Sequence, residues 1–460
     1  MVFSSLYFLF TFLPVVVCIY FIVPVCLKNF VLLAASIFFY AWGEPVYVVL
    51  MLFSTVFNYL LGLDMGRSEG REKSRLLIFA VAVNLFILGF FKYYGFCVET
   101  INGIFHVEIS YRELALPIGI SFYTFQSLSY IIDVYYDRVK VQHDYLKFAL
   151  YLTMFPQLIA GPIVQYSDIE NQLEERKITL ASFGRGVDRF ILGLSRKVLL
   201  ANNLGMIYTQ VQALEQRSVL SVWIGIFAYT LQIYFDFSGY SDMAIGLGKM
   251  FGFTFLENFQ YPYTAGSVTE FWRRWHISLS SWFRDYVYIP LGGNRVPRWK
   301  HVRNILIVWM LTGLWHGASW NFVAWGLYYG VLLLIEKYLL ADRWEAVPQG
   351  FRRMITLLLV MIGWVFFSNT NISDALFYLG NLVGSGTDGM IDRSGLYSLR
   401  SNLMLLLLGW IMCGPSPDEW FRKLTERKPV QAVVVDTALF LICLAYLVYS
   451  SYNPFLYFRF

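Results

Sequence analysis

Charged residues are scarce in this chain of 460 residues. Asp, Glu, Lys and Arg make up 15% of it, whereas a soluble protein carries about 25%. At the same time 57% of the residues are hydrophobic and 19% are aromatic, a composition that suits membrane interfaces and helix packing. A soluble domain is therefore excluded, and the sequence predicts a polytopic membrane protein.

Cysteine is also rare, and the five cysteines form no CxxC pair, which excludes a disulfide framework. The sequence lacks HxxxH spacing, a P-loop and a hydrolase elbow, so we expect no metal and no bound cofactor. The net charge of +5 is small and argues against nucleic-acid binding. The cysteines lie mostly in apolar runs and are expected to be small core residues: Cys18, Cys26, Cys97, Cys413 and Cys443.

Apolar runs recur from end to end and predict an all-α fold. One crossing takes about 20 residues, so the shorter runs must be tilted, re-entrant or broken, and we expect about eleven to thirteen transmembrane or re-entrant helices. The first run lacks the basic flank of a secretory signal. The runs lie near residues 6–27, 30–42, 46–63, 76–97, 114–132, 147–164, 187–205, 220–248, 303–315, 318–340, 354–368, 401–413 and 431–450.

No linker or internal repeat interrupts these runs, so we expect a single membrane domain over residues 1–460. If the basic loops face the cytoplasm, the N-terminus and residues 98–112 lie outside. Beyond residue 165 the loops carry both signs of charge, so loop charge does not assign their side of the membrane. We divide the domain into N-terminal helices (1–113), a core (114–340) and C-terminal helices (341–460).

A basic segment rich in tryptophan, residues 257–303, interrupts the core. So many arginines favour the cytoplasmic face, and the interleaved aromatic residues would let the segment lie in the interface. One interpretation is an amphipathic helix that fixes topology. The other is a cavity floor whose basic groups attract an anionic donor, such as a nucleotide phosphate or an acidic carrier protein.

Two of the five histidines lie in aromatic, glycine-containing surroundings. His316 sits inside an apolar stretch, where an ionisable group costs a few kcal/mol unless it is partnered. Gly313 and Gly317 leave room around its imidazole. A re-entrant return of the chain could bring His276 into the same pocket. The remaining three are expected to be solvated loop residues: His106, His143 and His301.

Two carboxylates, Asp236 and Asp242, lie in another apolar run. Carboxylates at membrane depth are functional candidates, able to orient an imidazole or to bind a substrate hydroxyl. Alternatively, they cap a helix that breaks at Ser238 and Gly239.

Three motifs resemble the membrane-bound O-acyltransferase family, and within it the bacterial alginate O-acetyltransferase group. The combination of RRWHISLS and GLWHGA is highly specific, and further stretches at 1–17, 119–138, 155–166 and 453–460 fit the same group, so the resemblance covers essentially the whole chain. The three motifs are FDFSGYSDMAIGLGKMFGF (235–253), ENFQYPYTAGSVTEFWRRWHISLSSWFRDYVYIPLGGNR (257–295) and LTGLWHGASWNFVAWGLYYG (311–330).

The resemblance implies a helical membrane core around a central tunnel, with His316 as the near-invariant histidine and His276 as the second active-site residue. It implies transfer of an acetyl group from a cytoplasmic thioester such as acetyl-CoA towards an extracytoplasmic polysaccharide, at the bacterial cytoplasmic membrane, with a periplasmic or cell-surface acetyltransferase finishing the transfer. D-alanyl transfer from a carrier protein to teichoic acid and small-substrate transport are the alternatives. Further candidates for lining the tunnel are Asp236, Tyr240, Asp242, Trp272, Arg273, Trp275, Trp315 and Asn321.

Overall fold

The computed structural model describes residues 1–159, 161–449 and Leu456. The chain is an all-α polytopic membrane protein, with no β-strand among these residues. The closing stretch that fits the acyltransferase pattern, 453–460, lies outside the described residues except for Leu456. Within the described part, nine helices are long and apolar enough to cross a bilayer: Val25–Gly43, Val48–Arg67, Gly70–Phe105, Leu180–Gln212, Val219–Met250, Trp320–Leu340, Gln349–Ser368, Arg393–Met412 and Pro429–Tyr449.

Several predicted runs correspond to shorter or more polar helices. The run at 147–164 is divided, because α6 (Tyr145–Thr153) ends before the proline that opens α7 (Phe155–Leu158). The run at 114–132 becomes α5 (Ile120–Tyr135), which has 16 residues. The run at 303–315 belongs to α14 (Arg298–His316), whose first turns are basic. These elements suit short or re-entrant segments surrounded by protein.

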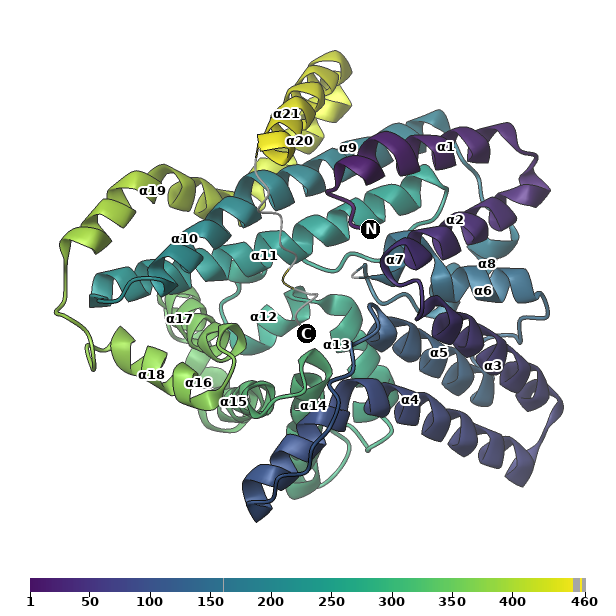
Figure 1. The fold of residues 1–460 in the computed structure, drawn as a ribbon, viewed down its shortest axis with the longest axis horizontal. Helices are drawn as coiled ribbons and strands as arrows, with labels where there is room; N and C mark the ends of the chain where they lie inside the picture. The colour runs from purple at the N-terminus through teal and green to yellow at the C-terminus, as the bar shows by residue number, and fades with distance from the viewer. Residues whose placement is uncertain (160, 450–455, 457–460) are drawn as a thin grey trace. The chain divides into compact units, whose positions relative to one another are not determined.

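The chain divides into two compact units, and the first comprises residues 1–190 and 241–256 (Figure 1). Its centre is aromatic: the ring of Phe155 packs against those of Phe8, Phe12 and Phe39. Besides α5, α6 and α7 it contains η1 (Phe8–Phe12), α1 (Leu13–Ile22), η2 (Val25–Leu27), α2 (Lys28–Gly43), α3 (Val48–Arg67), α4 (Gly70–Phe105), α8 (Tyr166–Glu174) and most of α9 (Leu180–Ser195).

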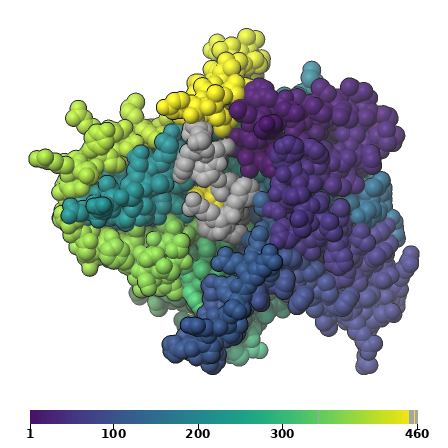
Figure 2. Space-filling view, viewed as in Figure 1, coloured from purple at the N-terminus to yellow at the C-terminus, as the bar shows by residue number. Residues whose placement is uncertain are grey.

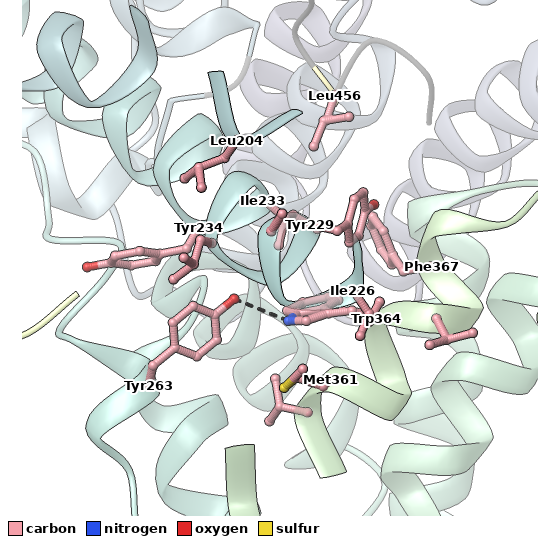
Figure 3. Close-up of a cluster of buried hydrophobic side chains, with 14 of the residues drawn as sticks. Leu204, Ile226, Tyr229, Ile233, Tyr234, Tyr263, Met361, Trp364, Phe367 and Leu456 are labelled. Carbon is pink, nitrogen blue, oxygen red and sulfur yellow. Dashed lines mark hydrogen bonds between the residues drawn. The ribbon is translucent and has the colours of Figure 1, made fainter. Parts of the chain in front are cut away.

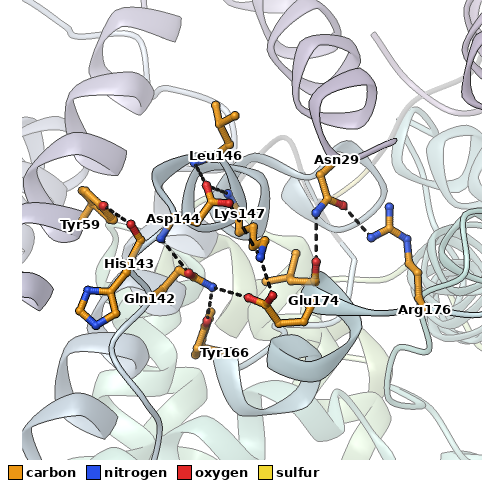
Figure 4. A network of polar contacts seen from close by, with 11 residues as sticks. Asn29, Tyr59, Gln142, His143, Asp144, Leu146, Lys147, Tyr166, Glu174 and Arg176 are labelled. Carbon is orange, nitrogen blue, oxygen red and sulfur yellow. Dashed lines mark hydrogen bonds and ion pairs between the residues drawn. The ribbon is translucent and has the colours of Figure 1, made fainter. Parts of the chain in front are cut away.

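A polar network ties loops of this unit together (Figure 4). The amide of Gln142 donates to the hydroxyl of Tyr166 at 2.9 Å and contacts Glu174 at 3.5 Å. Arg176 donates to Asn29 at 2.6 Å, and the Asn29 amide donates to the Leu173 carbonyl at 3.0 Å. These bonds join helices α2 and α8 with the segment that follows α8, so the polar residues of this region are structural.

The second unit comprises residues 191–240 and 257–460 and contains both candidate histidines. Helix α11 (Val219–Met250) is continuous through Ser238 and Gly239, so the interpretation of Asp236 and Asp242 as caps of a broken helix is wrong. Besides α14, this unit contains η3 (Arg196–Ala201), α10 (Asn202–Gln212), most of α11, η4 (Pro262–Thr264), α12 (Val268–Arg274), α13 (Ile277–Phe283), η5 (Arg284–Tyr288), α15 (Trp320–Ile335), η6 (Glu336–Leu340), α16 (Ala341–Glu345), α17 (Gln349–Ser368), α18 (Ile372–Leu382), α19 (Arg393–Met412), α20 (Ser416–Arg427) and α21 (Pro429–Tyr449).

Helices α14 and α15 approach one another very closely. A Cβ atom built on Gly313 would lie 2.1 Å from the backbone oxygen of Phe322, and one built on Gly317 would lie 2.1 Å from the Phe322 ring. The two glycines therefore make room for α15, in contrast to the expectation that they make room for the imidazole of His316. This contact fixes the end of α14, where His316 lies.

A large apolar cluster backs this region (Figure 3). Trp364 on α17 is 1% exposed, and its indole N–H donates to the hydroxyl of Tyr263 at 3.2 Å. Tyr263 in turn donates to the carbonyl of Thr230 on α11 at 2.6 Å. A buried Tyr and Trp need such partners, and these bonds fix α17 and the segment before α12 against α11.

The expectation that the cysteines are core residues is correct only for Cys413 and Cys443, which are buried. It is wrong for Cys18, Cys26 and Cys97, which are exposed in the structure. Apolar context in a membrane chain does not by itself imply burial in protein, because lipid also accepts apolar side chains.

Candidate functional site

His276 lies between two short helices, α12 and α13. Ser267 starts α12 by accepting a hydrogen bond from the backbone N–H of Glu270 at 3.0 Å, and α12 ends at Arg274. The backbone of His276 is then in the left-handed region, with φ of 45°, before α13 begins at Ile277. The side chain at this turn is 1% exposed. The turn therefore interrupts the helix between α12 and α13 and buries the imidazole.

Asn258 positions the His276 ring. Its side-chain oxygen accepts from the backbone N–H of Ser278 at 3.1 Å and from the Ser278 hydroxyl at 2.9 Å, and Nδ1 of His276 lies 3.2 Å from the same oxygen. Since that oxygen is an acceptor, Nδ1 carries the proton and donates to it. Nε2 is then the basic nitrogen of the ring.

The environment of His276 keeps its ring neutral. The residue lies outside the nine candidate spans, and its burial lowers its pKa to about 3, because an imidazolium would lose its hydration. The ring of Phe237 packs edge-on against it, with centroids 4.6 Å apart. At neutral pH His276 can therefore accept a hydrogen bond through Nε2 without carrying a charge.

His316 is the last residue of α14 and lies beside His276. The centroids of the two imidazole rings are 6.5 Å apart. Trp325 and Phe367 pack edge-on against the His316 ring at 5.0 and 5.3 Å, while Trp315 lies 5.9 Å from His276 and 5.0 Å from His316. The structure thus brings the two predicted imidazoles into one aromatic enclosure.

A cavity of about 480 Å³ reaches His276. Its wall includes Trp272 and Arg273 from α12, Arg284 from η5 and Thr312 from α14. Both arginines are exposed, and Arg284 forms a two-point ion pair with Asp285, at 2.8 and 3.0 Å. The basic segment therefore supplies part of a cavity wall, which favours the second of its two interpretations.

The two membrane carboxylates have cationic partners. Asp236 forms a buried ion pair with Lys197, and its second oxygen accepts from the backbone N–H of Leu456 at 2.7 Å. Asp242, in the first unit, pairs with Arg189 at 2.6 Å. A carboxylate at membrane depth needs such a partner, so the structure directs both groups to cations and not to an imidazole.

The other predicted residues occupy different places. Trp275 is buried and contacts Trp364, with ring centroids 4.9 Å apart, and Tyr240 is buried on α11. The side-chain amide of Asn321 donates to the carbonyls of Phe366 and Asn369, both at 2.6 Å, and so holds α15 against the end of α17. Of the predicted set, Trp272 and Arg273 line the cavity with His276, and Trp315 contacts both imidazoles.

The prediction that His301 is a solvated loop residue is wrong. It lies in α14 and is 2% exposed. Its Nε2 is 2.8 Å from the hydroxyl of Tyr288 and its Nδ1 is 2.7 Å from that of Tyr338. Neighbouring Lys300 and Arg303 made the segment look like a loop, but α14 begins before them. His106 and His143 are exposed, as expected.

The ion pair of Lys197 and Asp236 gives a stability prediction. Asp236→Ala would remove the buried carboxylate that pairs with Lys197, which is 2% exposed, and we expect a loss of about 3–5 kcal/mol in the free energy of unfolding. Thermal unfolding of the detergent-solubilised protein measures it. Glu426→Ala is the control, because Glu426 is 61% exposed in its pair with Arg422 on helix α20 and the loss should be about 0–1 kcal/mol. Equal stability of the Asp236→Ala variant and the parent would contradict the buried pair.

Sequence reasoning missed several residues around the site. Asn258 precedes His276 by 18 positions, and nothing in the spacing links them. Phe237, Trp325 and Phe367 come from three different helices. Lys197 had a detectable signal, because it is a lysine within the predicted apolar run 187–205.

The fold and the site together define an integral membrane protein with a buried two-histidine centre. The chain belongs to the membrane-bound O-acyltransferase family, whose model matches residues 133–377. It is therefore a membrane acyltransferase, as the motifs predicted.

Individual relatives are consistent with this assignment. The chain is 44% identical to "Probable alginate O-acetylase AlgI" of Azotobacter vinelandii over 414 residues, which are 88% of this chain and 83% of that protein. It is 36% identical to "Peptidoglycan O-acetyltransferase" of Helicobacter pylori, over 84% of this chain and 80% of that protein. It is 27% identical to "Teichoic acid D-alanyltransferase" of Bacillus subtilis, over 55% of this chain and 68% of that protein.

Proposed function

We propose that this acyltransferase moves an acetyl group from a cytoplasmic thioester, acetyl-CoA, towards hydroxyl groups of an extracytoplasmic polysaccharide such as alginate. The observation that carries the proposal is the pair of imidazoles, 6.5 Å apart between ring centroids and enclosed by aromatic side chains. The O-acetylation named for the more similar relatives, at 44% and 36% identity, supports acetyl as the group transferred.

The reaction needs few catalytic side chains, because a thioester is already activated for acyl transfer. In the direct route, His316 accepts the proton of the acceptor hydroxyl while that oxygen attacks the thioester carbonyl. The C–S bond breaks, and the proton passes to the thiolate that leaves. General-base assistance of this kind typically contributes about 10²–10⁴-fold. In the alternative route His316 is the nucleophile and an acetyl-imidazole carries the group onward.

His276 suits an orienting role in this scheme. With Nδ1 donating to Asn258, its Nε2 accepts a hydrogen bond and can hold the acceptor hydroxyl or the thiol of the donor. The same tautomer argues against polarisation of the carbonyl by His276, which would need an N–H at Nε2. The cavity at His276 is the proposed donor side.

Arg273 is the residue we assign to the anionic part of the donor. It is exposed and lines the cavity that His276 also lines. Arg284 lines the same cavity, but its charge is offset by Asp285. A guanidinium suits phosphate, and a basic rim raises the local concentration of an anionic substrate.

The location and partners follow from this chemistry. A donor made in the cytoplasm and an acceptor outside it place the protein in the bacterial cytoplasmic membrane. A separate extracytoplasmic acetyltransferase would complete the transfer to the polysaccharide.

Reconstitution into liposomes tests the proposal. We expect labelled acetyl-CoA supplied on the basic side to be consumed, with label appearing on the protein or on an added polysaccharide acceptor. The D-alanyl alternative, supported by the teichoic acid relative, predicts turnover of a D-alanyl carrier protein instead. Movement of a small solute across the membrane without acyl turnover would favour a transporter and overturn the proposal.

A further inference from the structure

We propose that a slot between α11, α17 and α19 binds one acyl chain of a bilayer phospholipid. The slot, called the acyl slot below, has a volume of about 460 Å³. It lies in the second unit and well apart in sequence from the histidine motifs. Its lining includes Trp223 and Phe227 of α11, Leu358 and Met361 of α17, and Leu403 and Trp410 of α19.

The chemistry of the slot is uniformly apolar. All eleven residues that line it are Leu, Ile, Met, Phe or Trp. The indole N–H of Trp223 donates to the carbonyl of Leu382 at 3.0 Å, so this polar atom already has its partner. Water needs two to four polar partners to occupy such a space, and this lining offers almost none.

All three walls of the slot belong to candidate membrane spans. Helix α19 forms the outer wall, and only 17% of its most apolar stretch is buried within the protein. It appears yellow-green at the edge of the unit in Figure 2. At hydrocarbon depth an empty apolar slot would forfeit dispersion contacts along its whole lining. The surrounding bilayer supplies a filler of the right polarity.

The volume of the slot distinguishes between two apolar occupants, a lipid acyl chain and a transmembrane helix. A helix about 10 Å wide crossing about 30 Å of hydrocarbon would fill roughly 2,400 Å³. The slot has about a fifth of that, so it can enclose an acyl chain but not a whole transmembrane helix. A single flexible acyl chain can enter between α17 and α19 and follow their side chains.

The slot also backs a helix that supports the site. Met361 contributes to the slot, and Trp364 and Phe367 lie on the same helix, α17. Phe367 packs against His316, with ring centroids 5.3 Å apart. An acyl chain in the slot would therefore contact the helix whose Phe367 packs against His316. The lipid site itself does not depend on the proposed reaction.

Native mass spectrometry of the detergent-purified full chain tests the proposal by counting retained phospholipid. In Leu358→Phe/Leu403→Phe the larger rings would fill the slot, and we expect this variant to retain one phospholipid fewer than the parent. The matched control is Leu396→Phe/Leu441→Phe, whose leucines are 52% and 57% exposed and do not line the slot. Equal counts in all three proteins would overturn the proposal.

A second experiment uses the unmodified protein, so it does not depend on a variant that folds. Phosphatidylglycerol with a diazirine on one acyl chain is added to proteoliposomes and photolysed, and the labelled peptides are mapped. We expect labelling concentrated on the slot faces of α17 and α19, reduced several-fold by excess unlabelled lipid. Uniform labelling of exposed faces such as that of α21, or a cross-link to a co-purified protein, would overturn the proposal.

Discussion

His316→Ala is expected to abolish acetyl transfer while the protein still inserts and folds. The imidazole is the group that accepts the acceptor proton or the acetyl group, and its loss should lower the rate by at least about 10²–10⁴-fold. The His316 ring packs against Trp325 and Phe367, but the closest approach of α14 to α15 is made by Gly313 against the backbone of Phe322, so the helices should remain in place. Turnover of labelled acetyl-CoA by the purified variant, with its gel-filtration profile and unfolding temperature, measures both properties.

The control is another histidine to alanine change at a site without a proposed role. His143 is exposed in the first unit, and His143→Ala should keep the activity of the parent. Retained acetyl transfer in well-folded His316→Ala would rule out both the base and the nucleophile roles. Loss of activity together with loss of the gel-filtration peak would require the milder change His316→Gln.

Gly313→Ala is the change from which we expect the largest structural damage for one added methyl group. Its Cβ would lie 2.1 Å from the backbone oxygen of Phe322. A backbone atom cannot rotate away, so α14 and α15 must separate. Overpacking typically costs about 1–3 kcal/mol, and here we expect the upper part of that range. His316 follows on the same helix, so acetyl transfer should fall with the unfolding temperature.

Gly89→Ala provides the matched comparison, because a Cβ at this glycine of α4 would have no atom within 4 Å. A glycine inside a helix is about 0.8–1.0 kcal/mol less favourable than alanine, so this variant should be as stable as the parent or slightly more so. If Gly313→Ala were equally harmless, the close contact of α14 and α15 would not exist in the membrane.

Membrane spans could be predicted well because the bilayer imposes length and apolarity on each of them. The break at Pro156 and the basic start of α14 explain why some runs turned out shorter or more polar than an ideal span. The sequence also allowed His276 and His316 to share one pocket, and the structure does bring their rings together, with centroids 6.5 Å apart; their catalytic roles stay a prediction.

Pairings between distant residues could not be predicted from one sequence. Asp236 looked like a partner for an imidazole, but Lys197, 39 positions earlier, lies closer in space. His301 looked solvated because its neighbours are basic, yet two tyrosine hydroxyls from other elements enclose it. Such contacts depend on how helices pack, which hydrophobic periodicity does not specify.

The left-handed backbone at His276 bears on how its contribution should be measured. Apart from glycine, mainly asparagine, aspartate and histidine are found at such a φ, which is 45° here, and holding another side chain there costs roughly 1–3 kcal/mol. Alanine at this position would remove the imidazole and its bond to Asn258 while retaining the conformational penalty, so a drop in rate would mix chemistry with fold damage. Asparagine tolerates this conformation more readily, and it is the replacement that separates the two contributions.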